Sequence, residues 1–323
     1  MSDLCSRNDM SASLPPLFPD RKVLLRKFDR SVSLLSWAYN EEENVEDFVR
    51  RAIALLEASV EEFELVIVDD GSRDQTPAIL ARLIKEFPQL RVVTNEVNRQ
   101  VNYSWRRAIQ SARKEYLFWQ TLDWSYDISR LREFLELLKT YTVVAGVRRA
   151  PVAQATRFSR WLESVLQLFH HKHLTKRSDT VSKALVSVCN YCLIRCLFGV
   201  PISDYMNVMF IPTKLIQELK FESRGSFPEP LIKLYWLGHT FIEAPISFLP
   251  RQLGEAKGTR FLALYKATHD VITLWFKWVV LNRFSPKQPA PVRRFDPQEW
   301  EVAMPDEKAM PEQLSGPALG ERA

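Results

Sequence analysis

Acidic and amide side chains are concentrated in two short polar segments of the N-terminal half of this chain. The first reads Ser36-Trp-Ala-Tyr-Asn-Glu-Glu-Glu-Asn44, and the second reads Val66-Ile-Val-Asp-Asp-Gly-Ser-Arg-Asp-Gln-Thr76. Each begins within an apolar run and continues into several carboxylates. Carboxylates in this setting suit a nucleotide diphosphate held through a divalent cation, because Mg²⁺ and Mn²⁺ take carboxylate and phosphate oxygens together.

The elements that position these side chains alternate along the chain. Short apolar runs, typical of buried strands, are found at 32–38, 63–68, 92–94, 116–119 and 142–146. Between them, apolar residues recur at helical spacing at 45–56, 77–84, 104–112 and 128–138. Strands that alternate with helices predict an α/β fold, in which a doubly wound, mainly parallel sheet has helices on both faces.

Polar residues follow every predicted strand. In chain order they are Tyr39 to Glu42, Asp69 to Ser72, Asn95 with Asn98, Asp123, and Gly146 to Arg148. Ligands of open α/β sheets bind outside the carboxyl ends of the strands. Helix capping explains any one of these groups, but five together favour a ligand site. Neither a G-x-x-x-x-G-K-[ST] nor a G-x-G-x-x-G motif follows the first strand, which argues against a P-loop ATPase or an NAD enzyme.

Composition restricts the partners and the compartment. The formal net charge of +5 fits a protein that meets phosphates or an anionic surface, and it does not require nucleic acid. Four cysteines in 323 residues do not form a disulfide framework; three of them (Cys189, Cys192, Cys196) have helical spacing and are expected to be buried. No signal peptide or membrane-spanning stretch is evident. We therefore expect a cytoplasmic protein with at most peripheral membrane contact.

Four regions are expected. Residues 1–30 are predicted to be a flexible arm, 31–258 the main domain, 259–285 an amphipathic helical region, and 286–323 a proline-rich tail. In the third region Lys266, Asp270, Thr273 and Lys277 share a narrow face, and Trp275, Phe276 and Trp278 are among the apolar residues of the remainder. Lysines beside aromatic residues favour an interfacial helix on the cytoplasmic face of a membrane. The alternative is burial in a homo-oligomer interface or in the core.

The two motifs at their observed spacing resemble the opening of family 2 inverting glycosyltransferases. The dolichol-phosphate mannosyltransferase-like branch, whose members act on polyprenyl phosphates, is the most similar, and the resemblance extends from about Ser31 to Lys257. It implies a GT-A (Rossmann-like) fold. It also implies a GDP- or UDP-sugar donor, Mg²⁺ or Mn²⁺ as cofactor, and inverting transfer to a polyprenyl-phosphate lipid.

The resemblance also implies roles for individual residues. On the donor side, Tyr39 and Glu41 line the nucleobase pocket, Asp69 and Asp70 bind base and ribose, Asn98 belongs to the same set, and Arg251 and Lys257 neutralise the pyrophosphate. Asp123 matches the second carboxylate of the family's D-x-D metal motif, and Arg148 matches an arginine that faces the phosphates. Asp204, Arg148 and Glu229 are the predicted catalytic residues, with Asp204 as the implied base or positioning group.

Departures from the family pattern leave alternatives open. The metal motif reads Thr121-Leu122-Asp123, and positions that are usually glycine are Gln100, Asn102 and Ala108. Sugar-acceptor relatives carry a Glu-Asp pair where this chain has Glu229-Pro230, and the missing acid favours a phosphate acceptor, which is already ionised. The alternatives are a transferase acting on a saccharide hydroxyl and a degenerate nucleotide-binding partner protein without turnover.

Overall fold

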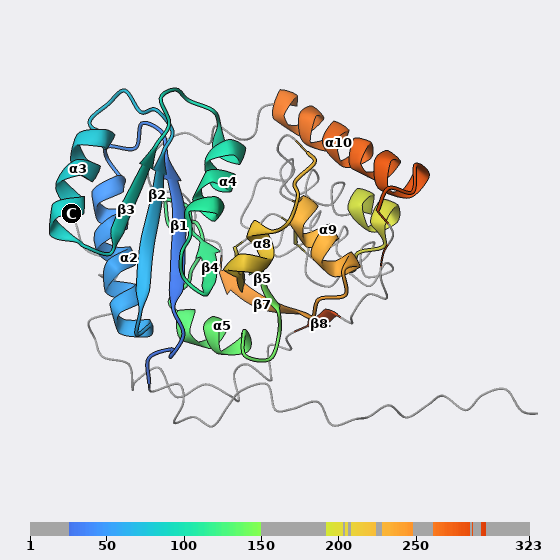
Figure 1. The fold of residues 1–323 in the computed structure, drawn as a ribbon, viewed down its shortest axis with the longest axis horizontal. Helices are drawn as coiled ribbons and strands as arrows, with labels where there is room; N and C mark the ends of the chain where they lie inside the picture. The colour runs from blue at the N-terminus through green and yellow to red at the C-terminus, as the bar shows by residue number, and fades with distance from the viewer. Residues whose placement is uncertain are drawn as a thin grey trace, which may run out of the picture.

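A computed structural model describes residues 26–149, 192–202, 204–205, 208–223, 228–247, 261–284, 286 and 292–294. Its centre is an eight-stranded sheet with the order β3-β2-β1-β4-β6-β5-β7-β8 (Figure 1). The strands are β1 (Val32–Ala38), β2 (Phe63–Asp69), β3 (Leu90–Thr94), β4 (Tyr116–Trp119), β5 (Val143–Arg149), β6 (Met209–Pro212), β7 (Phe241–Ser247) and β8 (Val292–Arg294). Only β6 runs antiparallel to its neighbours. The expected α/β fold with a mainly parallel sheet is confirmed.

Helices cover both faces of the sheet. They are α2 (Val45–Ser59), α3 (Thr76–Glu86), α4 (Val101–Ser111), α5 (Leu131–Leu137), α8 (Thr213–Gln217), α9 (Pro228–Trp236) and α10 (Phe261–Trp275). In Figure 1, α2 and α3 flank the first strands on one side and α4 lies on the other. The first strands and helices fall where the apolar pattern predicts them, with ends that differ by a few residues.

The alternation of side chains along the strands divides the interior into two cores. Leu34 of β1 and Leu65 of β2 point to the face covered by α2, α3 and α5, whereas Leu35 and Val66 point to the opposite face. All four are fully buried. A strand buried on both faces reads as a continuous apolar run, which is why these strands were predictable.

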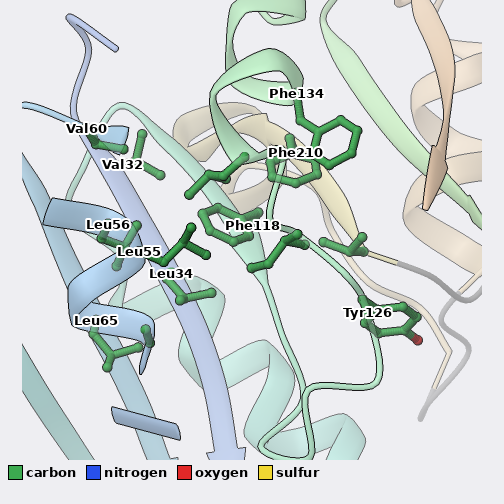
Figure 2. Packing of buried hydrophobic residues seen from close by; sticks show 14 of the residues in the cluster. Val32, Leu34, Leu55, Leu56, Val60, Leu65, Phe118, Tyr126, Phe134 and Phe210 are labelled. Atoms are coloured by element: carbon green, nitrogen blue, oxygen red, sulfur yellow. The ribbon is translucent and has the colours of Figure 1, made fainter. Parts of the chain in front are cut away.

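Aromatic packing joins the two halves of the sheet. Phe118 of β4 stacks on Phe210 of the antiparallel β6, with ring centroids 4.8 Å apart, and Phe134 of α5 covers Phe210 at 5.4 Å (Figure 2). All three rings are buried. The sequence patterns above did not predict β6, because four residues that end in proline carry too little periodicity.

The C-terminal helix presents two different faces. α10 continues into a π-helical turn, η2 (Phe276–Val280). Val271, Leu274 and Trp278 are buried against the main domain. The expectation that Trp278 belongs to a membrane-facing surface is therefore wrong. A second set remains exposed and is called the exposed apolar stripe here: Ile272, Phe276, Val279, Val280 and Leu281.

Among the residues that the structure describes, no helix is long and apolar enough to cross a membrane. The cysteines Cys192 and Cys196 are exposed on a helical segment at 192–198, so the expectation of burial is wrong for these two. Exposure follows from the tertiary placement of this segment, which buries Ile194 and Phe198 instead.

Candidate active site

The two polar motifs form adjacent loops that hydrogen-bond to each other. We call 39–44 the first motif loop and 69–76 the second. Backbone N–H groups of each loop donate to side chains of the other: Asn40 to Ser72 Oγ (3.0 Å), Glu41 to Thr76 Oγ1 (2.9 Å), Glu42 to Asp74 Oδ2 (3.2 Å), Arg73 to Asn40 Oδ1 (2.9 Å) and Gln75 to Glu42 Oε2 (2.8 Å). Their polar residues are thus largely used to fix the loops, because each bond satisfies a backbone donor outside regular structure.

Gly71 allows the second motif loop to approach the segment after β3. Its φ is +70°, and a Cβ at this position would lie 2.8 Å from the carbonyl carbon of Val97. A side chain would therefore meet backbone, which cannot move aside like a flexible side chain. Only glycine satisfies both the left-handed conformation and the close approach.

Asp69 and Asp70 are buried and oriented by donors. Asp69 is 1% exposed, and its Oδ1 accepts a hydrogen bond from the backbone N–H of Ser72 at 3.1 Å. Asp70 is 4% exposed, and its Oδ1 accepts from Asn95 Nδ2 at 2.6 Å and from the backbone N–H of Arg99 at 2.9 Å. Carboxylates held in this way are pre-organised to accept hydrogen bonds from a ligand.

Asn95 has an orienting role that sequence reasoning missed. Its Nδ2 also donates to Ser104 Oγ at 3.0 Å, and its Oδ1 accepts from the guanidinium of Arg107. Both partners lie on α4, so Asn95 joins the end of β3 to that helix and to Asp70. The available signal was its place directly after the predicted third strand.

Gln100 occupies a backbone conformation that suits glycine. It is the residue before α4 and has φ 71° and ψ 161°. This region is populated almost only by glycine, and other residues there are strained by about 1–3 kcal/mol. The family resemblance expected glycine in this segment, and the structure shows that the chain retains the conformation without it.

A turn after β4 explains the altered metal motif. The backbone N–H of Ser125 donates to Thr121 Oγ1 at 3.3 Å, and Ser125 Oγ donates to Asp123 Oδ1 at 2.6 Å. Trp124, at φ 50°, anchors the turn by packing on Phe48. Thr121, which stands where the resemblance leads us to expect a carboxylate, is a turn residue here.

The predicted metal motif therefore offers one carboxylate, that of Asp123. No cluster of three or more His, Cys, Asp or Glu side chains suited to a metal is present among the described residues. Mg²⁺ is commonly held by one or two carboxylates together with substrate phosphates and waters. The residues present fit a cation of that kind, held chiefly by the phosphates of its ligand.

The predicted donor residues that the structure describes lie at one edge of the sheet. Parallel pairing places Ala38 of β1 opposite Asp69, and Asp69 opposite Thr94 of β3, so both motif loops and the segment carrying Asn98 leave the same edge of the sheet. Tyr39 and Glu41 lie in the first motif loop, and the turn with Asp123 follows the neighbouring β4.

Glu229 lies instead in a group that we call the charge cluster: Arg106, Glu222, Glu229 and Lys233. Its carboxylate is fully buried and accepts from the backbone N–H of Glu222 (2.6 Å) and of Ser223 (2.9 Å). Lys233 Nζ lies 3.0 Å from Glu229 Oε1, and Arg106 Nη2 lies 4.0 Å from Oε2. Burial lowers the pKa of Arg106, against the opposing influence of Glu229 and Asp270. Glu229 thus holds its surroundings together through both carboxylate oxygens.

The remaining predicted site residues are placed only in part. Asp204 is buried, at 5% exposure, ahead of β6. The backbone of Arg148 lies in β5 opposite Ile246 of β7, and its side chain is outside the described part of the structure. Arg251 and Lys257 also lie outside the described residues. Their assigned roles stay predictions.

The sequence matches the family Glycosyl transferase family 2 over residues 33–196, which is about half of the 323 residues. This match covers the motif loops, α4 and the turn with Asp123. The chain belongs to this family.

Individual relatives agree with this assignment. The chain is 30% identical to glycosyltransferase AglD of Haloferax volcanii over 130 residues, which are 39% of this chain and 21% of that protein. It is 24% identical over 251 residues to undecaprenyl-phosphate 4-deoxy-4-formamido-L-arabinose transferase of Photorhabdus laumondii, covering 76% of this chain and 67% of that protein. The chain therefore spans about a fifth of AglD and two thirds of the second relative.

A solved structure confirms the fold. Glucosyl-3-phosphoglycerate synthase from Mycobacterium tuberculosis, crystallised with Mn²⁺, UDP and phosphoglyceric acid, superposes with a TM-score of 0.53 at 15% identity. The likeness covers 77% of this chain and 78% of that one. At this identity it supports the GT-A architecture alone.

Proposed function

We propose that this glycosyltransferase moves a sugar from a GDP- or UDP-sugar to a polyprenyl phosphate, with inversion at the anomeric carbon. The observation that carries the choice of acceptor is the engagement of Glu229. Its two carboxylate oxygens accept backbone N–H groups and face Lys233, so it is poorly placed to remove a proton from a sugar hydroxyl. A lipid phosphate is already ionised and needs orientation more than a base.

In the proposed reaction, a phosphate oxygen of the lipid attacks the anomeric carbon from the face opposite the leaving group. The bond between that carbon and the β-phosphate oxygen breaks, and its electron pair leaves with the nucleoside diphosphate. Asp69 and Asp70 bind the base and ribose of the donor, and Tyr39, Glu41 and Asn98 complete this pocket. Arg148, Arg251 and Lys257 would stabilise the developing charge, because cations aimed at the leaving group act where charge develops.

A divalent cation, Mg²⁺ or Mn²⁺, would neutralise the diphosphate when it is bound, with Asp123 as its protein ligand. The solved structure of similar fold was crystallised with Mn²⁺ and UDP together, which motivates the test with a divalent cation. Asp204, buried beside the second half of the sheet, is the proposed positioning group or base for the acceptor.

Membrane contact is proposed through the exposed apolar stripe. Phe276 and Val280 are 48% and 51% exposed, and Lys277 lies between them in the same π-helical turn. Apolar side chains beside a lysine suit the surface of an anionic bilayer. The relative named as an undecaprenyl-phosphate transferase supports a lipid acceptor. The cytoplasmic face of the membrane is the proposed location.

The test is transfer of radiolabelled sugar from a panel of GDP- and UDP-sugars to undecaprenyl phosphate in liposomes, with Mn²⁺, Mg²⁺ or EDTA. Asp123→Asn should reduce metal-dependent transfer by about 100-fold, because the site has one carboxylate. Asp127→Asn, an exchange in the same loop region, is the matched control. Transfer by Asp123→Asn at the wild-type rate would remove Asp123 from the metal site.

A second experiment separates the acceptors. Phe276→Ser with Val280→Ser should release the protein from anionic liposomes and lower lipid transfer, whereas donor binding should persist. Activity on a soluble saccharide in place of lipid would instead support the saccharide-hydroxyl acceptor. Nucleotide binding without transfer to either acceptor would support the degenerate, non-catalytic alternative.

A further inference from the structure

Three helices fix a short segment of the chain, residues 219–223, from different directions. Arg106 of α4 donates to the carbonyl oxygen of Ser223, and its guanidinium lies over the ring of Phe221 at 4.9 Å. From α9, Glu229 accepts the backbone N–H groups of Glu222 and Ser223. The third helix is the π-helical turn η2, which reaches the segment through one side chain.

That side chain is Trp278. Its indole Nε1 donates to Glu222 Oε1 at 3.0 Å, and the same oxygen lies 3.2 Å from Lys233 Nζ. Lys233 Nζ also lies over the Trp278 ring, 4.9 Å from its centroid. Trp278 is 1% exposed, whereas the side chain of Glu222 is 37% exposed, so the hydrogen bond joins a buried donor to a carboxylate at the surface.

The helix that carries Trp278 also carries the exposed apolar stripe. Phe276 and Val280 are exposed two residues on either side of the buried Trp278. π-helical turns are rare and occur frequently at functional sites. Here the turn puts a solvent-exposed apolar surface and a buried contact to the charge cluster on one short element.

The contacts that begin at Trp278 continue through Arg106 to the proposed donor site. Arg106 belongs to α4, the helix that begins directly after Gln100. Two further residues of α4, Ser104 and Arg107, hold Asn95, which in turn holds Asp70. The segment 219–223 therefore connects η2, which carries part of the exposed apolar stripe, to α4. Through Asn95, α4 orients Asp70, which is predicted to bind the sugar-nucleotide donor.

We propose that Trp278 is a positioning residue, which ties the membrane-facing helix to the donor site through Glu222, the segment 219–223 and Arg106. The proposal rests on the proposed function for its consequence, transfer to a lipid phosphate. Attachment of the helix to a bilayer would then hold 219–223 and α4 in the arrangement that aligns donor and acceptor. Loss of the indole N–H would loosen this alignment without removing any residue that contacts the donor.

The chain offers a matched control for this hydrogen bond. Trp236 is also buried in the aromatic cluster around Trp278, and its Nε1 donates to the carbonyl oxygen of Phe198 at 3.0 Å. Trp278→Phe and Trp236→Phe therefore each remove one buried indole donor and keep an aromatic ring. Only the first removes a contact to 219–223.

The first measurement is hydrogen–deuterium exchange of the peptide containing 219–223 in the full-length protein without ligand. In Trp278→Phe the amides of Glu222 and Ser223 should exchange about tenfold faster than in Trp236→Phe, since their segment loses a charge-assisted hydrogen bond. Equal exchange in the two variants overturns the proposal. This result does not depend on the identity of donor or acceptor.

The second measurement is the kinetics of transfer from the active nucleotide sugar to undecaprenyl phosphate in anionic liposomes. Trp278→Phe should lower kcat about tenfold, with the donor KM and liposome binding within about twofold of wild type. Trp236→Phe should stay within about twofold in all three. Parallel losses in both variants would show a merely structural role. If the wild type transfers no sugar to lipid, the proposed function fails, and the exchange experiment alone decides the role of Trp278.

Discussion

The two motif loops, which we call the donor half of the site after the proposed sugar-nucleotide donor, and the charge cluster are stabilised in different ways. In the donor half, backbone N–H groups of one motif loop donate to side chains of the other, and the partners come from two sequence segments about 35 residues apart. In the charge cluster, Arg106 meets Ser223 and Glu229 across more than 100 residues of sequence. The motif loops are held mainly by hydrogen bonds from backbone N–H groups. The charge cluster instead depends on the buried ion pair of Glu229 and Lys233.

This difference determines how each region should respond to substitution. Loss of one loop hydrogen bond leaves a backbone donor that can turn to water at the sheet edge. Loss of one charge in the cluster leaves the opposite charge buried without compensation, which is costly. The donor half should therefore be sensitive to shape and the charge cluster to charge.

The largest effect is expected at Glu229. Glu229→Leu leaves the buried Lys233 and the half-buried Arg106 beside an apolar side chain and removes the acceptor of two backbone N–H groups. We expect the free energy of unfolding to fall by about 3–5 kcal/mol, measured by urea denaturation. Glu57→Leu, at an exposed position of α2, should change it by less than about 0.5 kcal/mol. A loss below about 1 kcal/mol for Glu229→Leu would mean that the cluster is not interdependent.

The second largest effect is expected at Gly71, where the second motif loop lies close to the backbone of Val97. Gly71→Ala places a Cβ 2.8 Å from the backbone of Val97 at a φ of +70°, whereas Gly199→Ala, at a φ of +66°, meets nothing within 4 Å. Both variants incur the left-handed penalty of about 1 kcal/mol. Only Gly71→Ala should lose about 1–2 kcal/mol more, together with nucleotide binding measured by calorimetry. Equal losses would show that the two loops can move apart freely.

At Gln100 we expect a substitution to raise the free energy of unfolding instead of lowering it. Gln100→Gly relieves strain at φ 71° and ψ 161°, and we expect a gain of about 1 kcal/mol in the free energy of unfolding, after the extra entropy of the unfolded chain is subtracted. Asn40→Gly is the control, because Asn40 tolerates its φ of 52° and accepts a hydrogen bond from Arg73. It should give no gain. Destabilisation by Gln100→Gly would place the strain elsewhere.

The smallest effect is a change in acid stability through Glu64. Burial raises the pKa of this carboxyl, but hydrogen bonds from Ser33, Arg91 and the backbone of Arg113 outweigh it, so the pKa lies below its ordinary value of 4.5. A lowered pKa stabilises the fold above that value, and the contribution is lost as the pH falls through the folded-state pKa. Glu64→Gln should flatten this part of the stability curve, measured by urea denaturation as a function of pH. An unaltered slope in Glu64→Gln would contradict the assignment.

The sequence by itself determined the donor half. Val32–Ala38 and Tyr116–Trp119 were predicted to the residue, because strands buried on both faces read as continuous apolar runs. The polar residues after the strands were predicted to meet at one edge, and the pairing of β1, β2 and β3 confirms this for the motif loops. These determinants are local, so period and spacing reveal them.

Only the tertiary structure decided the orientation of the C-terminal helix and the surroundings of Glu229. Trp278 and Phe276 are both apolar, and the sequence pattern does not distinguish them. Only the tertiary structure shows that Trp278 is buried and Phe276 is exposed. Likewise, the partners of Glu229 lie on α4, on α9 and in 219–223, which no spacing rule connects. Contacts between distant segments depend on how the layers pack, and a one-dimensional pattern records only the preference for burial, not the partner.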